Sequence, residues 1–228
     1  MIHLAYFFAV LLGFAHYYSK QFCLSCRAFG GASKIVSLFA GISVTYILLD
    51  LFPSFSEQVL PLNKLLFLSL LAGVVIFHVV EKATYLYASK DKVMKDIALE
   101  QSTTFFIYHV LVGITLVSFI ELGLYKATLF FIPIFLYALI SPLITKPPKY
   151  ESAKLFLASG ALIGVIIAAV LYPTINPFIE LSLLGFVIGA LFYIVLRHSI
   201  PSTKEGQPFY FLAGAIIYTG LILWGWFS

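Results

Sequence analysis

Ionisable side chains inside long apolar stretches are the residues of this sequence that could carry chemistry. His109 lies about two turns into the apolar stretch that begins near residue 101. A charged group near the middle of a bilayer costs about 2.5–3.5 kcal/mol, which makes such a residue a candidate for function. A neutral imidazole costs far less. His109 therefore fits either a functional group or a hydrogen-bonded packing residue.

His78 and Glu81 have the spacing i and i+3, which puts them on one face of a helix and within contact. They could form a proton-coupled pair, although a glutamate followed by Lys82 at a helix end is more often an interfacial anchor. Asp50 and His198 are predicted at helix ends near the lipid headgroups, where charged groups are tolerated, and structural roles are expected for both.

Cys23 and Cys26 are the two cysteines of the chain and form a CxxC motif, which we predict in the first loop. A zinc site of this kind needs a second pair of Cys or His ligands, and the sequence offers none. We therefore expect a structural pair of thiols.

The composition requires elements that lie in lipid. Hydrophobic residues make up 61% of the 228 residues and charged residues only 11%, with a mean hydropathy of +1.03. A soluble domain carries roughly 25% charged residues, and each crossing needs about 20 apolar residues. We predict an all-α, polytopic membrane protein with a single transmembrane domain over residues 1–228. Its eight helices are expected at residues 2–18, 34–53, 64–86, 101–121, 126–144, 153–172, 180–198 and 207–227.

The positive charges predict the orientation of these helices, because cytoplasmic loops carry the excess of Lys and Arg. One set of alternate loops holds only Lys64 and Lys126. The other set holds Lys20, Arg27, Lys34, Lys82, Lys90, Lys92, Lys95, Lys146, Lys149, Lys154, Arg197 and Lys204. Both termini are predicted outside, in a multi-pass protein of a plasma or inner membrane. The positive charges form no run, so a nucleic-acid partner is not expected.

Two sequence phrases recur. GISVTYILLDLFP at residues 41–53 matches GALFYIVLRHSIP at residues 189–201, and LAGVVIFH at residues 71–78 matches LAGAIIYT at residues 212–219. The paired segments cross the membrane in opposite directions in the predicted topology. This pattern is typical of an inverted repeat, here of three, two and three helices.

These phrases resemble the ZIP family of zinc and iron transporters. FAGISVTYILLDLFPSF looks like that family's Gly-rich second helix, and LAGVVIFHVVEK is similar to its third helix, which ends in a Glu, here Glu81. SGALIGVIIAAVL and the segment from Gly185 to Tyr218 carry similar Gly spacings. The resemblance implies eight helices, outside termini, a three-two-three repeat and metal ion transport.

The two metal-binding motifs of the family are lost in this sequence. With Gly113 aligned to the HNxxDG motif, Tyr108, His109 and Val112 replace its His, Asn and Asp. With Pro133 aligned to the HExPHE motif, apolar residues stand at the four ligand positions, namely Phe130, Phe131, Ile134 and Phe135. Because zinc needs three or four N, S or O ligands, the usual two-metal site is not expected.

Three hypotheses about function remain open. The first is a transporter of an ion or small solute, with path candidates His109, Tyr108, Thr115, Ser118, His78 and Glu81. The second is a non-transporting partner or regulatory subunit, with a hydrophobic plug of Val112, Phe130, Phe131, Ile134 and Phe135. The third is a transporter of zinc or another divalent metal with ligands relocated to His78, Glu81 and Asp50. Motifs of soluble enzymes are absent. No enzyme activity, cofactor or resident metal is expected, and the lipid bilayer, a second copy or another membrane protein are the expected partners.

Overall fold

The computed structural model describes residues 2–28, 31–87, 93–144, 151–171, 176–199 and 206–227. Within these residues, eight helical segments are long and apolar enough to cross a membrane, which confirms the predicted class of all-α membrane protein. The elements are α1 (Ile2–Ala28), α2 (Ala32–Tyr46), η1 (Ile47–Leu51), α3 (Phe52–Leu62), η2 (Lys64–Leu66), α4 (Phe67–Tyr87), α5 (Val93–Glu121), α6 (Leu124–Ile144), α7 (Glu151–Leu171), α8 (Pro177–Ile194), η4 (Val195–Ser199) and α9 (Pro208–Phe227).

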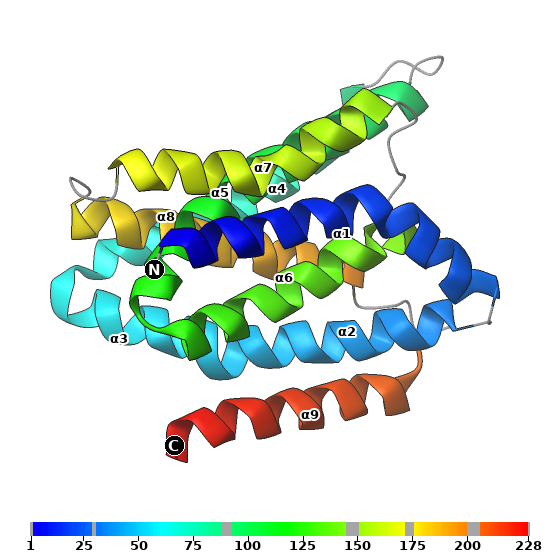
Figure 1. The fold of residues 1–228 in the computed structure, drawn as a ribbon. Coiled ribbons are helices and arrows are strands. Elements are labelled where there is room, and N and C mark those ends of the chain that lie inside the picture. The colour runs from blue at the N-terminus through cyan, green and yellow to red at the C-terminus, as the bar shows by residue number, and fades with distance from the viewer. Residues whose placement is uncertain are drawn as a thin grey trace.

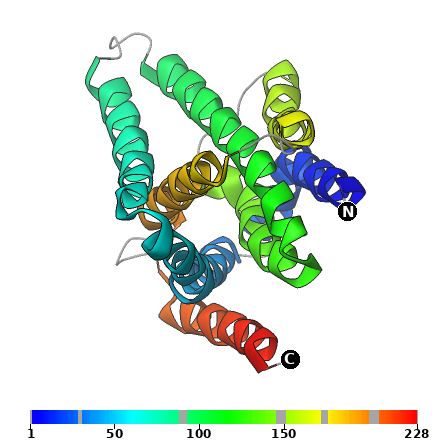
Figure 2. The same cartoon turned by 90° about the vertical axis from the view of Figure 1, so that its left-hand side faces the viewer.

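The helices form one elongated bundle (Figure 1). A short turn at Leu122 and Gly123 joins α5 to α6, and Gly123 has a φ of 125°, a conformation that favours glycine. Helix α1 begins and helix α9 ends toward the end of the bundle where this turn lies (Figure 1). We call it the turn end, and the other the opposite end. Seen from the turn end, α9 lies at the edge of the bundle (Figure 2).

The second span differs from its predicted boundary of residues 34–53. It continues through Pro53 to Leu62, because Pro53 lies in the first turn of α3, where proline is tolerated. The helix widens just before it into the π-helix η1, in which the Phe52 N–H bonds to the Ile47 carbonyl. The prediction that Asp50 lies at a helix end was therefore wrong, since Asp50 lies within a continuous span of 31 residues.

The first span also exceeds its predicted end at residue 18, because α1 continues to Ala28. The CxxC motif is thus on a helix and not in a loop. Cys23 is buried, and its Sγ donates to the Leu139 carbonyl oxygen at 3.3 Å. The side chains of Cys26 and His198 lie outside the described residues.

The recurring phrases occupy matching places in the bundle. Helix α2 packs on α9, where a methyl group added at Gly41 would overlap the Phe211 carbonyl and one added at Gly214 would overlap that of Leu38. Helix α8 packs on α4 in the same way through Gly189 and Gly73. Each of these helix pairs joins the first phrase of one half to the second phrase of the other half.

Both π-helices belong to the first recurring phrase. The π-helix η1 begins six residues after Gly41, and η4 begins six residues after Gly189. Since π-helices are rare and often mark functional sites, their equal placement adds a structural likeness to the similarity of the two phrases.

Candidate functional site

A cavity of about 80 Å³ lies at the turn end between α3, α5, α7 and α8. Most of its lining is apolar, and its polar side chains are Gln58, Thr115, Ser118 and Glu180. The structure therefore brings Thr115 and Ser118 together at one cavity, as two neighbouring residues on the face of α5.

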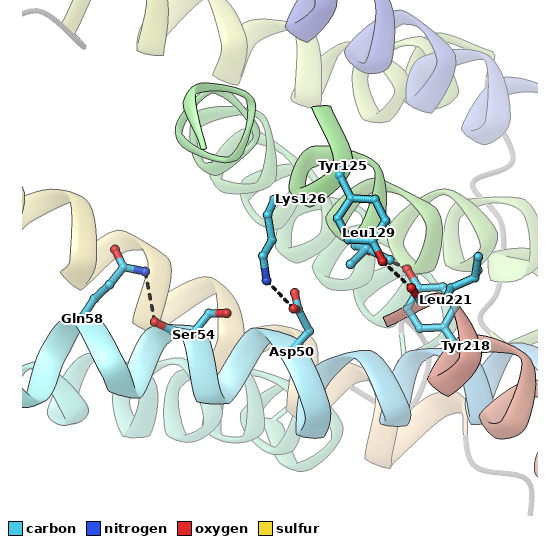
Figure 3. Close-up of polar contacts among 8 residues, drawn as sticks. All are labelled: Asp50, Ser54, Gln58, Tyr125, Lys126, Leu129, Tyr218 and Leu221. Carbon is cyan, nitrogen blue, oxygen red and sulfur yellow. Dashed lines mark hydrogen bonds and ion pairs between the residues drawn. The ribbon is translucent and has the colours of Figure 1, made fainter. Parts of the chain in front are cut away.

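An ion pair lies beside η1, where Lys126 Nζ is 2.5 Å from Asp50 Oδ1 (Figure 3). Asp50 and Gln58 have the spacing i and i+8 on one continuous helix, and Ser54 lies between them on the same face (Figure 3). Because Gln58 also lines the cavity, the cavity and the ion pair lie along the same face of this helix.

Buried polar atoms without a hydrogen-bond partner gather in the described interior. They include the hydroxyl groups of Tyr46, Tyr108, Thr115 and Tyr137, and Oδ2 of Asp50. Tyr46 lies within electrostatic range of both Asp50 and Tyr108, and Tyr137 within that of Tyr108. Buried polar groups normally have partners, so such a set calls for an explanation, for example water or a bound ligand.

Apolar side chains separate these polar groups along the bundle. At 1.5 Å per residue, Lys126, Phe130, Ile134 and Tyr137 lie about 3, 9, 15 and 20 Å from the start of α6. Phe130 and Ile134 are fully buried, as is Val112 on α5. We call Val112, Phe130 and Ile134 the apolar barrier. It lies between the Asp50 ion pair at the turn end and the hydroxyls of Tyr108 and Tyr137 deeper in the bundle.

The aromatic rings of α6 face different neighbours. Phe130 stacks on Phe119 of α5 with ring centroids 4.5 Å apart, and it forms a T-shaped pair with Tyr46 of α2 at 6.5 Å between centroids. Phe131 instead stacks on Phe8 of α1, also at 4.5 Å, and contacts Phe135, which is only partly buried. Of the five predicted plug residues, Val112, Phe130 and Ile134 thus lie at the barrier, whereas Phe131 and Phe135 lie toward α1.

Glu81 forms a second polar cluster, toward the opposite end. Its carboxylate accepts from the Tyr193 hydroxyl at 2.6 Å and from Arg197 Nε at 3.2 Å. The exposed His78 places its ring 5.7 Å from that of Tyr193. The predicted pair His78 and Glu81 is therefore gathered around Tyr193, and Arg197 of η4 supplies the positive charge.

His109 is fully buried and has a partner that the sequence did not indicate. Its Nε2 is 2.6 Å from Nε2 of His16 on α1, and its Nδ1 is 2.7 Å from the Phe105 carbonyl oxygen. The second contact requires a proton on Nδ1, because a carbonyl only accepts. In a neutral His109, Nε2 then accepts a hydrogen bond from the Nε2–H of His16. This arrangement satisfies both nitrogens of His109 without a ligand.

Sequence reasoning missed several members of these clusters. They include Asp50 as an interior residue, its partner Lys126, His16, Tyr193 and Arg197. Asp50 did leave a signal, since it is a carboxylate inside an apolar run, but Pro53 was interpreted as the end of that helix. Within the described residues, no group of three or more His, Cys, Asp or Glu side chains could hold a metal ion.

These features define an integral, multi-pass α-helical membrane protein whose described residues include two ion pairs, each with a buried carboxylate and a more exposed cation. Comparison with the models of known protein families finds no match, and comparison with curated proteins finds none either.

Proposed function

We propose that this protein is a membrane transporter of an ion or small polar solute, described here in a closed state. The observation that carries the proposal is the set of buried, unpartnered hydroxyl and carboxylate oxygens on both sides of the apolar barrier. Polar groups are expensive inside a membrane and typically mark the path of a substrate or ion. Packing alone gives no reason to keep four such hydroxyls in the interior.

The proposed architecture is a divergent ZIP-like inverted repeat of three, two and three helices. It is supported by the matching glycine contacts of α2 with α9 and of α8 with α4, and by the equal placement of η1 and η4. Transporters with such repeats bind their substrates between the repeats. In this proposal α5 and α6, which have no counterpart in the repeat, lie between the two repeats. Following the positive charges, we place the turn end outside, in a plasma or inner membrane.

The residues at the barrier do not fit zinc as a cargo of the family's two-metal site. Hydroxyl groups and a single carboxylate suit a hard cation, a proton or a small hydrogen-bonding solute, whereas zinc prefers thiolate and imidazole. The rival hypothesis of a non-transporting partner subunit needs no path through the barrier, so opening the barrier separates the two.

The test is a pair of neighbouring substitutions, Phe130→Ala and Phe131→Ala, in proteoliposomes that enclose a pH-sensitive dye. A potassium diffusion potential drives protons, and the dye reports their entry. Phe130→Ala should raise the proton leak above that of wild type, because it removes the ring that closes the path. Phe131→Ala should not, because that ring packs on Phe8 of α1.

Both substitutions remove the same side chain from a buried position, and each should cost about 3–5 kcal/mol of stability. Should that be too much for folding, Phe130→Leu and Phe131→Leu form a milder pair with the same logic. Equal leaks in the two variants of either pair would refute the transporter and favour the non-transporting subunit.

A further inference from the structure

The Asp50 carboxylate is the most buried charge of the described residues that has an unused oxygen. It is 2% exposed, Lys126 contacts only Oδ1, and Oδ2 has no partner. We propose that Asp50 is a proton-binding site, at which a proton taken up from the turn end replaces Lys126. The proposal rests on the transporter function and names its coupling ion.

Lys126 and Asp50 differ in whether they can reach solvent once the ion pair is broken. The side chain of Lys126 is 34% exposed, and the residue lies about 3 Å from the start of α6. Its ammonium group can therefore rotate out into the solvent at the turn end. Asp50 is enclosed by the bundle and has no such route. A buried carboxylate without its partner is strongly unfavourable. The pair can therefore open only if Asp50 becomes neutral.

Binding of a proton neutralises the Asp50 carboxylate and needs no further ligand. The step is RCOO⁻ + H⁺ → RCOOH, with Lys126 remaining an ammonium, so one positive charge is taken up. The new O–H is a donor, and Tyr46, one turn earlier on the same helix, is within electrostatic range of Asp50 and has a hydroxyl oxygen without a partner, which a shift of the side chains would allow to accept it. A metal cation would instead need about six oxygen ligands, and the surroundings of Asp50 offer far fewer.

The titratable groups around Asp50 are few. Tyr46 comes from its own helix and Lys126 from α6, and Tyr218 of α9 is within electrostatic range. Tyr218 is already engaged, since its hydroxyl donates to the Leu129 carbonyl at 2.6 Å (Figure 3). The other elements that contact η1 carry four further titratable side chains. Glu57 of α3 is exposed, and Glu180 of α8 lines the cavity. Tyr193 of α8 binds Glu81, and the ring of Tyr210 of α9 lies under Lys34.

Exchange at Asp50 would also move a helix. The ion pair connects α6, which carries the barrier residues Phe130 and Ile134, to η1 of the second span. Loss of this connection frees the start of α6 from η1, and the π-helix is a place where a helix can rearrange. Proton uptake thus becomes coupled to the position of the barrier.

The first experiment measures how readily Lys126 reacts with a membrane-impermeant amine-acylating reagent in proteoliposomes at fixed pH, by mass spectrometry. Asp50→Asn mimics the protonated carboxyl and should speed acylation of Lys126 by at least about tenfold, because a charge-assisted contact is lost. Glu57→Gln, the same kind of change on the exposed face of the same span, should leave the rate unchanged. Acylation of Lys64, which is exposed at the same end, corrects for delivery of the reagent.

The second experiment observes the proton itself by infrared difference spectroscopy of the wild-type protein from about pH 8 to about pH 4. We expect the carbonyl band of a buried protonated carboxyl, absent in Asp50→Asn, shifted in Asp50→Glu and retained in Glu57→Gln. No such band, or a band unchanged in both Asp50 variants, would overturn the proposal, as would an unchanged Lys126 rate. If the Phe130 variants leak as expected while these results fail, transport stands and only Asp50 as its proton site falls.

Discussion

Replacing Lys126 with methionine should destabilise the protein by an amount that falls as the pH falls. The variant keeps the length of the side chain but removes the charge that lies 2.5 Å from Asp50. Breaking a buried pair by removing one partner typically costs about 3–5 kcal/mol. This cost has an upper limit, because a protonated carboxyl carries no charge that needs a partner. Protonating an ordinary aspartate at pH 7 takes about 4 kcal/mol.

That limit falls by about 1.4 kcal/mol for each unit of pH. We therefore expect a deficit of up to about 4 kcal/mol at pH 7 and less than about 2 kcal/mol at pH 5. The reverse variant, Asp50→Asn, leaves Lys126 unpaired but able to reach water, since it is 34% exposed. Its cost should be smaller, about 1–2 kcal/mol, and the double variant should be more stable than Lys126→Met alone at pH 7.

The assay is unfolding of the detergent-solubilised protein in a denaturant series at several pH values, relative to wild type at the same pH. A Lys126→Met deficit that is equal at pH 7 and pH 5 would show that no buried charge had been stranded. A larger deficit for Asp50→Asn than for Lys126→Met would refute the assignment of Asp50 as the enclosed partner.

Two further predictions concern metal transport and helix packing. Proteoliposomes that contain this protein should take up no more zinc than empty ones in a radiotracer assay, and saturable uptake abolished by His109→Ala would contradict this. Gly189→Ala should lower the free energy of unfolding by about 1–3 kcal/mol, and with it the unfolding midpoint, because the added methyl group overlaps the Leu70 carbonyl. Gly220→Ala on α9, where the space is open, should not lower it; equal losses would show that the close contact of α8 with α4 is unimportant.

The number and type of elements followed from the sequence because lipid imposes one rule on every segment. About 20 apolar residues must cross as a helix, and the predicted eight spans match the eight that the structure describes. The helix ends were less predictable. Pro53 looked like a stop signal, yet the helix widens into η1 just before this proline and the span continues through it.

The interior contacts were beyond the sequence because they join residues far apart in the chain. His16 and His109 are separated by 93 residues, and Glu81 and Arg197 by 116. Only the pairing of α1 with α5, and of α4 with α8 and its continuation η4, brings them together. Asp50 could have been recognised as an interior charge from its apolar neighbours alone, but its partner Lys126 could not.

The most direct test of a path through the bundle is the labelling of single cysteines from each side of the membrane. Thr115→Cys lies at the cavity of the turn end and Tyr137→Cys lies beyond the barrier, each introduced after Cys23 and Cys26 are replaced by serine. A membrane-impermeant thiol reagent is added to one side of oriented proteoliposomes. We predict that Thr115→Cys reacts only from the turn end and Tyr137→Cys only from the opposite end. Failure of both cysteines to react from either side, with the protein folded, would contradict the proposed transport path.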